Sequence, residues 1–212
     1  TGSKGIIGSG LIKWILYVNK LSNLNCKIVA SSRSNERPEY IENSDPIVYC
    51  NIGEERKVLK DKVDYIVHTA APTSNKIFQS QPVESLDVIV SGTKAMLELA
   101  KDMDAEMIYI SSEEAYGTPN IDEAIDEKYV GAVDSLNIRN CYPLGKKVAE
   151  LMCKSYYSEY QTKVKIIRPT VVLGLWQKYD SVKVEAEILR CVLENRNLQM
   201  KSDGSTKKCV IY

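Results

Sequence analysis

The sequence opens with Thr1-Gly2-Ser3-Lys4-Gly5-Ile6-Ile7-Gly8, in which three glycines stand three residues apart directly before an amphipathic segment. Gly2 allows a tight turn, Gly5 allows the backbone to approach a pyrophosphate, and Gly8 allows a helix to pack closely on a strand. The helix N-terminus that follows offers N–H groups and a partial positive charge to that pyrophosphate. Glycine triples also occur in ordinary turns, so the rest of the sequence must show whether this one binds a phosphate.

Beyond this turn, short apolar runs of strand length alternate with longer segments of helical periodicity. This alternation is typical of a parallel sheet with helices on both faces, so we expect a Rossmann-type, doubly wound α/β fold. The expected strands are residues 27–31, 47–50, 65–69, 107–111 and 164–168, and the expected helices are residues 10–18, 83–103, 143–160 and 182–194.

The chain divides into two parts in this interpretation. We expect residues 1–170 to form a dinucleotide-binding domain and residues 171–212 to begin a substrate-binding lobe. The opening turn normally follows a hydrophobic strand, and the sequence stops in the apolar run 209–212 just after a turn-like segment. We therefore expect the first strand and most of the C-terminal lobe to lie outside the sequence given.

Composition excludes several classes of function. Lys plus Arg is 28 and Asp plus Glu is 28, so the chain offers no basic field to DNA, RNA or an anionic membrane surface, and we expect neither as a partner. The six cysteines are scattered without a CxxC pair, and one histidine leaves little to complete a zinc site, so no metal is expected. Without an apolar run of spanning length or a signal segment, a cytoplasmic location is the expectation.

The segment after the second expected strand bears on the choice of cofactor. An NAD site usually places an acidic residue there, which binds the adenosine ribose. The chain instead reads Ala30-Ser31-Ser32-Arg33-Ser34. Arg33 could hold the 2′-phosphate of NADP, or it could be a solvated surface residue. The hypothesis is NAD or NADP, with a preference that is relaxed or leans towards NADP.

Tyr142 and Lys146 stand four residues apart, on one face at the start of an expected helix. A phenol with a pKa near 10 is a poor base at neutral pH. A neighbouring ammonium favours the phenolate, which can then take a proton from a hydroxyl while hydride leaves carbon. Such pairs are common in helices, so the order in the chain matters: the glycine turn, a strand ending in Ser111-Ser112, then Tyr142 and Lys146.

In this order the motifs resemble those of the extended short-chain dehydrogenase/reductases, the NAD-dependent epimerase/dehydratase family that acts on nucleotide sugars. TGSKGIIG resembles the family's TGxxGxxG turn, and HTAAPTS at 68–74 resembles the segment that lines the cofactor. ISSEEAYG at 110–117, YPLGKKVAE at 142–150 and IRPTVVLG at 167–174 resemble SSxxVYG, YxxxKxxxE and RPxNxYGP. Within the family, RNCYPLGKKVAELMC at 139–153 looks most like UDP-glucuronate decarboxylases, and Ser112-Glu113-Glu114 is also similar to sugar 4,6-dehydratases.

The resemblance implies a role for each matching residue. Ser112 would hydrogen-bond the reacting sugar hydroxyl, Tyr142 would be the general base, and Lys146 would hold the nicotinamide ribose and lower the pKa of the phenol. Glu113 or Glu114 would move protons next to a transient 4-keto group, unless the two form a solvated loop pair. The implied cofactor-binding residues are Gly2, Gly5, Ile6, Ile7, Gly8, Ser32, Arg33, Asn51, Ile52, Thr69, Ala70, Ala71, Ile110, Tyr142, Lys146, Pro169 and Val172.

The chain departs from the family's patterns at positions near the substrate. Val171 and Leu173 stand where the family has Asn and Tyr, and Ile89 stands where many relatives carry Asn, so the substrate stays open. The leading interpretation is an NAD(P)-dependent nucleotide-sugar lyase or isomerase of the epimerase, dehydratase or decarboxylase type, which oxidises C4 of the sugar transiently. The alternatives are an NADP-dependent carbonyl reductase of the same fold and a non-catalytic dinucleotide-binding protein.

The resemblance also implies a homodimer, joined by a four-helix bundle that the helices 83–103 and 143–160 form with their symmetry mates. His68, at the end of an expected strand, is interpreted as a packed residue lining the cofactor cleft rather than as a proton shuttle. The side chains consistent with the dimer surface are Met96, Leu99, Met152 and Tyr156.

Overall fold

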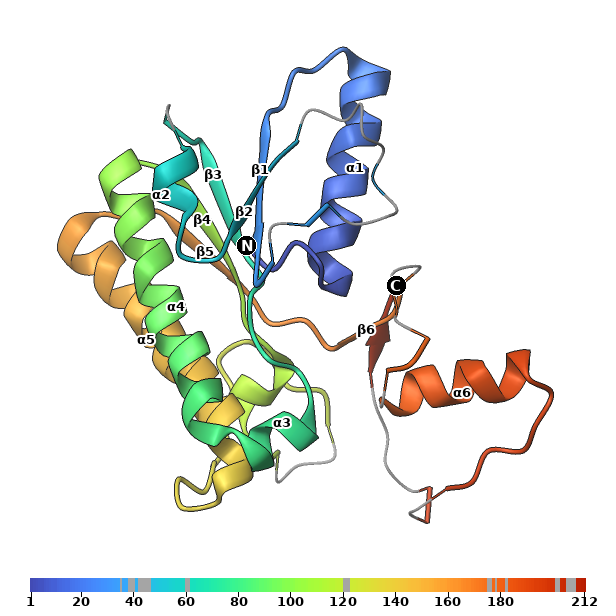
Figure 1. Ribbon diagram of the computed structural model, residues 1–212. Coiled ribbons are helices and arrows are strands. Elements are labelled where there is room, and N and C mark those ends of the chain that lie inside the picture. The colour runs from blue at the N-terminus through green and yellow to red at the C-terminus, as the bar shows by residue number, and fades with distance from the viewer. Residues whose placement is uncertain are drawn as a thin grey trace.

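The computed structural model describes residues 1–34, 36–37, 41, 47–59, 62–119, 123–174, 177, 179–181, 183–200, 203–204 and 209–212. Parallel strands alternate with helices along this part of the chain (Figure 1). The strands are β1 (Ile28–Ser32), β2 (Ile47–Asn51), β3 (Tyr65–His68), β4 (Glu106–Ile110), β5 (Val164–Ile167), β6 (Val171–Val172) and β7 (Val210–Ile211). The helices are α1 (Ile6–Ser22), α2 (Glu55–Val58), α3 (Asn75–Ser80), α4 (Pro82–Met103), α5 (Cys141–Tyr160) and α6 (Val184–Leu193), with 3₁₀ turns η1 (Glu113–Tyr116) and η2 (Ile138–Asn140).

The main strands pair in two parallel groups. β1 pairs with β2, and β3, β4 and β5 form a three-stranded sheet with β4 in the centre. Each parallel pair is joined through a helix or a longer connection, as parallel strands require. The expected Rossmann-type α/β fold is therefore confirmed, and all five expected strands are present with bounds shifted by one residue at most.

The opening residues connect these two groups at the carboxyl ends of their strands. The Thr1 ammonium donates to the Val67 carbonyl oxygen at 2.7 Å, and the N–H of Thr69 donates to the Thr1 carbonyl oxygen. On the other side, the N–H of Ser3 donates to the carbonyl oxygen of Ser31 at 3.1 Å. The glycine turn therefore begins between β1 and β3, close to where both strands end (Figure 1).

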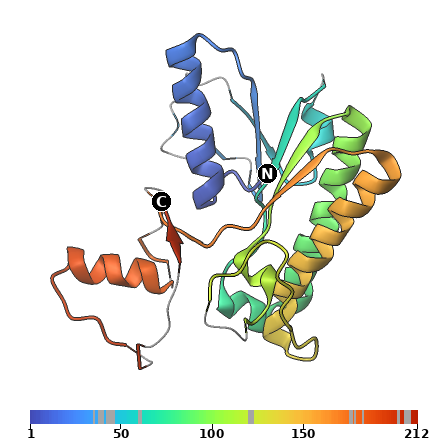
Figure 2. The ribbon, with the colours of Figure 1, turned by 180° about the vertical axis from the view of Figure 1, so that it is seen from behind.

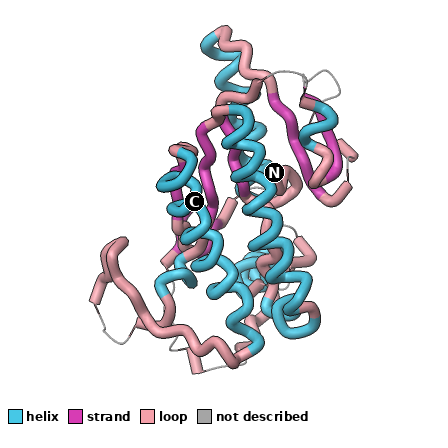
Figure 3. Tube along the Cα trace, turned by 90° about the vertical axis from the view of Figure 1, so that its left-hand side faces the viewer, coloured by secondary structure: helices cyan, strands magenta, loops and turns pink. Residues whose placement is uncertain are grey.

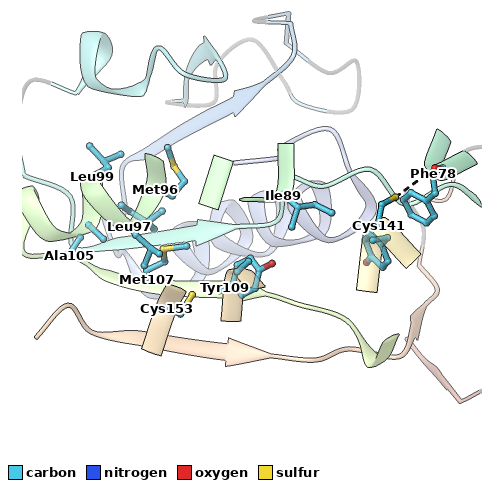
Figure 4. Packing of buried hydrophobic residues seen from close by; sticks show 14 residues of the cluster. Phe78, Ile89, Met96, Leu97, Leu99, Ala105, Met107, Tyr109, Cys141 and Cys153 are labelled. Carbon is cyan, nitrogen blue, oxygen red and sulfur yellow. Dashed lines mark hydrogen bonds between the residues drawn. The ribbon is translucent and has the colours of Figure 1, made fainter. Parts of the chain in front are cut away.

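The two long helices form one layer of the molecule. α4 and α5 lie side by side over β3, β4 and β5, as the side view shows (Figure 3). Between helices and strands lies a continuous core (Figure 4) that includes Phe78, Ile89, Leu97, Met107 and Tyr109. Because the apolar side chains of each long helix recur every three to four residues, burying this face fixes both helices on the sheet.

A second, smaller core lies between α1 and the β1–β2 pair. It joins Ile12 and Leu16 of the helix to Ala30 and Ile47 of the strands. α1 and the α4–α5 layer lie on opposite sides of the strands, whereas α6 and the short β6–β7 pair lie together beyond the C-terminal end of β5 (Figure 1, Figure 2). Helices thus cover the two groups of strands from opposite sides, as in a doubly wound fold.

Several bounds differ from the expectations. The expected start of the first helix at residue 10 is wrong, because α1 begins at Ile6 inside the glycine motif. Gly8 in the first turn of α1 packs against Gly2 and Ser3 of the preceding turn, and this close packing outweighs the poor helix propensity of glycine. The short helices α2 and α3 and the short β6–β7 pair were not expected from the sequence. The helix expected from residue 182 is present as α6, and residue 182 itself lies outside the described residues.

Candidate active site

The glycine turn has the geometry of a phosphate-binding loop. Gly2 has φ +73°, a left-handed conformation that favours glycine, and the N–H of Gly5 donates to the Gly2 carbonyl oxygen at 2.9 Å. A Cβ atom on Gly2 would lie 2.8 Å from the backbone nitrogen of Ala70, and one on Gly8 would lie 3.0 Å from the carbonyl carbon of Gly2. Turn, strand end and helix therefore approach one another more closely than any side chain would allow.

A cavity of about 410 Å³ opens beside the first turn of α1. Its walls are mostly apolar, and its size is within the range of small-molecule sites. Five residues that the sequence analysis assigned to the cofactor line it, namely Ile6, Ile7, Ile110, Pro169 and Val172. The structure thus brings the glycine turn together with the ends of β4 and β5 around one space, and these residues fit a dinucleotide.

The other expected cofactor residues lie at the carboxyl ends of β1, β2 and β3. Ser32 is buried, and the N–H of Ile52, which directly follows Asn51, donates to the Ser32 carbonyl oxygen at 2.8 Å. Arg33 is exposed. Thr69 donates its hydroxyl to the Thr1 carbonyl oxygen, and Ala70 and Ala71 follow it. All of these residues therefore belong to the edge of the sheet at which the glycine turn begins.

Tyr142 lies in the first turn of α5 and is only 7% exposed. Its ring stacks on Phe78 of α3, with the ring centroids 4.6 Å apart and an interplanar angle of 18°. Burial raises the pKa of the Tyr142 phenol, and a side-chain hydrogen bond with Ser112 opposes this by lowering it. The candidate base therefore has a fixed ring, and its hydroxyl lies near Ser112, the residue that caps η1 after β4.

Lys146 follows one helical turn later and is 3% exposed. Its ammonium donates to the Ile110 carbonyl oxygen at 2.7 Å and lies 4.8 Å from the centre of the Tyr109 ring and 5.9 Å from that of Tyr142. Burial lowers the pKa of Lys146 to about 8, while the Glu150 carboxylate opposes this shift. The net shift of the Tyr142 pKa is upward, because burial of the phenol dominates, and the lowering effect expected from Lys146 stays a prediction.

Lys146→Met tests the burial of this ammonium. The pKa of Lys146 is about 8 in the fold against an ordinary value of 10.5, so between these pH values the unfolded chain binds more protons than the folded one. The wild-type free energy of unfolding should therefore rise with pH relative to the variant, by up to about 1.4 kcal/mol per pH unit in this window. Denaturant unfolding of both proteins across the window measures it. A pH-independent difference would show that the ammonium is solvated.

The acidic pair follows β4 in the 3₁₀ turn η1. The Ser112 hydroxyl oxygen accepts the N–H of Glu114 at 3.2 Å and so caps this turn, and the N–H of Glu113 donates to the Pro169 carbonyl oxygen. The Glu114 carboxylate pairs with Arg139, whose two terminal nitrogens donate to its oxygens at 2.5 and 3.0 Å. The pair is therefore part of the structured site, and Arg139 holds the Glu114 carboxylate.

A second ion pair lies behind Lys146. Glu150 is buried and accepts the Ser111 hydroxyl at 2.6 Å, and Arg168 donates to both of its oxygens at 2.6 and 2.8 Å. The Arg168 guanidinium also lies 4.4 Å from the centre of the Tyr116 ring. These contacts tie α5 to the ends of β4 and β5. Sequence reasoning gave Glu150 and Arg168 no role, although both lie within motifs that it quoted.

His68 is fully buried at the end of β3, where its Nδ1 atom lies 2.7 Å from the Thr1 hydroxyl. Burial lowers the pKa of His68 to about 3, so the imidazole stays neutral at physiological pH. This supports a packed, structural histidine rather than a proton shuttle. Among the described residues, no group of three potential ligands could hold a metal ion.

The three departures from the family's patterns have different positions. Ile89 is 1% exposed and packs against Gly145 of α5. A Cβ atom on Gly145 would lie 3.3 Å from the Cδ1 methyl group of Ile89, so Ile89 fills the space between α4 and α5. Val171 begins β6 and pairs with Val210, and Leu173 lies in the wall of the cavity. Only Leu173 of the three therefore faces the space assigned to ligands.

The fold and the site define a Rossmann-type dinucleotide-binding protein with a Tyr–Lys pair at the carboxyl edge of its sheet. The family model "NAD dependent epimerase/dehydratase family" matches residues 1–212, and the chain belongs to this family. UDP-glucuronic acid decarboxylase 6 of Arabidopsis thaliana is 28% identical over 221 residues, which cover 100% of this chain and 61% of that protein.

Solved structures give the same fold. UDP-glucose 4-epimerase from Thermotoga maritima, solved with UDP-glucose, superposes with a TM-score of 0.82 at 20% identity, covering 100% of this chain and 67% of that one. UDP-glucuronic acid 4-epimerase from Bacillus cereus, in complex with UDP-glucuronic acid and NAD, gives 0.78 at 21% identity with the same coverage. The chain thus spans about three fifths to two thirds of the length of these relatives. In the part of it that the structure describes, no helix combines the length and apolar character needed to cross a bilayer.

Proposed function

We propose that the chain is the cofactor-binding part of a nucleotide-sugar epimerase, dehydratase or decarboxylase that oxidises C4 of the sugar transiently. The observation that carries this is the neighbouring Tyr142 and Ser112 side chains with the Lys146 ammonium 5.9 Å from the centre of the Tyr142 ring. Lys146 in turn contacts Ile110, which lines the cavity beside the glycine turn. A base, a hydroxyl donor and a dinucleotide cradle therefore belong to one continuous site.

In this proposal Ser112 binds the C4 hydroxyl of the sugar and Tyr142 removes its proton. A bound, oxidised nicotinamide would supply the hydride acceptor for C4, and its positive charge would favour the phenolate. Lys146 holds the nicotinamide ribose and remains close to the phenol. The Glu150–Arg168 pair fixes the helix that carries both residues.

The acidic pair would act at the stage of the 4-keto sugar. A ketone at C4 acidifies the neighbouring C–H bond and makes loss of water or of a C5 carboxyl group as CO₂ feasible. The carboxylate of Glu114 lies near enough to Tyr142 to raise the pKa of its phenol, with a smaller effect from Glu113. We therefore assign proton movement beside C4 to Glu114 first and Glu113 second.

We propose NAD as the cofactor, since the family is NAD dependent. NADP is the second candidate, because Arg33 is exposed at the end of β1 and the Lys4 ammonium reaches Ser34 at 2.6 Å. The 2′-phosphate of NADP, bound at the carboxyl end of β1, would lie near the cationic side chains of Arg33 and Lys4. Side-by-side titration of NAD and NADP decides between them, and tighter binding of NADP would reverse the assignment.

The reaction is tested by incubating the purified protein with UDP-glucuronic acid, UDP-glucose and dTDP-glucose and following the sugar by NMR. We expect conversion of one of these with no net change in the nicotinamide absorbance, because the cofactor is regenerated. Stoichiometric consumption of NADPH with a simple carbonyl compound would instead show a reductase. Dinucleotide binding with no turnover of any substrate would show a non-catalytic protein.

We also propose a homodimer built on α4 and α5. Met96 and Leu99 were wrongly expected at its surface, since both are buried in the chain's own core. Apolar side chains that are exposed on the same two helices support the dimer instead, namely Val83, Leu86, Val88, Val148 and Leu151. A monomer mass by light scattering would remove this proposal. We also propose, as a separate point, that residues 1–170 form the dinucleotide-binding domain and that residues 171–212 begin the substrate-binding lobe.

A further inference from the structure

Arg139, three positions before Tyr142, makes contacts that have no part in the mechanism proposed above. We propose that Arg139 is a positioning residue: it fixes the Glu114 carboxylate and supports the ring of Tyr142 through Phe78. The proposal rests on the proposed function, in which Glu114 and Tyr142 act on the sugar. It narrows that function by assigning one carboxylate of the acidic pair to proton movement and by naming what holds it in place.

The ion pair has the geometry of a two-pronged clamp. Arg139 Nη1 donates to Glu114 Oε2 at 2.5 Å, and Nη2 donates to Oε1 at 3.0 Å. Nη2 also donates to the side-chain oxygen of Asn75 at 2.9 Å. The planar guanidinium fixes both the position and the plane of a carboxylate, which a single ammonium contact does not. Arg139 thereby joins η2, η1 and α3, three elements that are far apart in the sequence.

The same guanidinium supports the candidate base. It lies 5.5 Å from the centre of the Phe78 ring, and this ring stacks on Tyr142. Phe78 is 2% exposed, so it cannot move without opening the packing at the start of α5. Figure 4 shows Phe78 next to Cys141, whose thiol donates to the Phe78 carbonyl oxygen at 3.7 Å. Ion pair, aromatic ring and phenol therefore form one connected unit.

The charges in this unit act on Tyr142 in opposite directions. Glu114 raises the pKa of the phenol, and Arg139 lowers it. The other ionisable groups around the phenol are Glu113 in η1, Lys146 and Cys141 in α5, and Tyr109 in β4. Removing the Arg139 charge would leave the Glu114 carboxylate uncompensated beside the phenol. The Tyr142 pKa should then rise further, and the carboxylate should lose its fixed orientation.

The test compares Arg139→Gln, Arg139→Lys, Glu114→Gln and the double variant Arg139→Gln/Glu114→Gln. We expect Arg139→Gln to lower kcat about 10- to 100-fold, as small misplacements of reacting groups do, with KM changed much less. The acidic limb of its kcat/KM profile should move to higher pH. Arg139→Lys should recover part of the rate, because it keeps the charge but not the clamp. The double variant should be slower than Glu114→Gln by less than the full Arg139→Gln effect, because part of that effect acts through Glu114 and the rest through the Phe78 ring.

A matched control is Arg56→Gln, which breaks an exposed ion pair with Asp102 between α2 and α4 and should leave kcat unchanged. Wild-type kcat and an unshifted pH profile in Arg139→Gln, or losses that multiply in the double variant, would overturn the proposal. One readout needs no turnover: the phenol of Tyr142 is titrated by ultraviolet difference against Tyr142→Phe. A higher Tyr142 pKa in Arg139→Gln supports the proposal even if no sugar is converted, and an unchanged pKa contradicts it.

Discussion

Tyr142→Phe is expected to lower kcat by about 10²- to 10⁴-fold, the range that a positioned general base contributes. The change removes only the hydroxyl, and the ring should keep its stack on Phe78 and its buried place at the start of α5. NAD affinity should therefore stay within about twofold of wild type. Steady-state turnover of the nucleotide sugar, together with NAD titration by fluorescence, measures both quantities on the same preparation.

The matched control for this prediction is Tyr157→Phe in the same helix. Tyr157 is half-exposed and lies four turns from Tyr142, so losing its hydroxyl should change neither turnover nor NAD binding. Near wild-type activity in Tyr142→Phe would remove the phenol from the mechanism and favour a different base. Loss of NAD binding in the same variant would give the phenol a binding role rather than a chemical one.

Gly8→Ala is expected to weaken NAD binding at least about 100-fold, because it opens the turn on which the pyrophosphate rests. A Cβ atom at this position would lie 3.0 Å from both the Gly2 carbonyl carbon and the Ser3 Cα atom. Both neighbours are backbone atoms, so the clash cannot be relieved by rotating a side chain. We therefore expect the free energy of unfolding to fall by about 1–3 kcal/mol. NAD titration reports the binding, and circular dichroism at the same temperature shows that the variant is folded.

Gly92→Ala provides the same chemical change at a neutral place. Gly92 lies within α4, and a Cβ atom there would meet nothing within 4 Å. Alanine should stabilise this helix by about 0.5–1 kcal/mol and leave NAD affinity unchanged. A folded Gly8→Ala protein that binds NAD as tightly as wild type would show that the turn does not carry the pyrophosphate.

Most of the fold could be predicted because its signals are local. The period of the apolar residues located the strands and the two long helices, and the glycine spacing located the turn. Helix bounds were less accurate at α1, where glycines within the first turn disguise the start. The short α3 and the β6–β7 pair had no periodic pattern to reveal them.

The candidate site was predicted only in part. The glycine turn and the Tyr142–Lys146 spacing lie within single motifs, and the structure brings both to the carboxyl edge of the sheet. The Arg139–Glu114 pair joins residues 25 positions apart, so no local spacing could show it. The net direction of the Tyr142 pKa shift could not be predicted, because it is set by burial, which is a property of the packed chain.

The sequence by itself determined the order of strands and helices, the class of nucleotide-binding turn and the residue types of the site. These features depend on backbone preferences and on the period of the apolar residues, and both are set by residues close together in the sequence. Only the tertiary structure decided which carboxylate meets a cation, which helix faces are buried, and how strongly the phenol and the ammonium are desolvated. These depend on distances between segments far apart in the chain, and only packing fixes such distances.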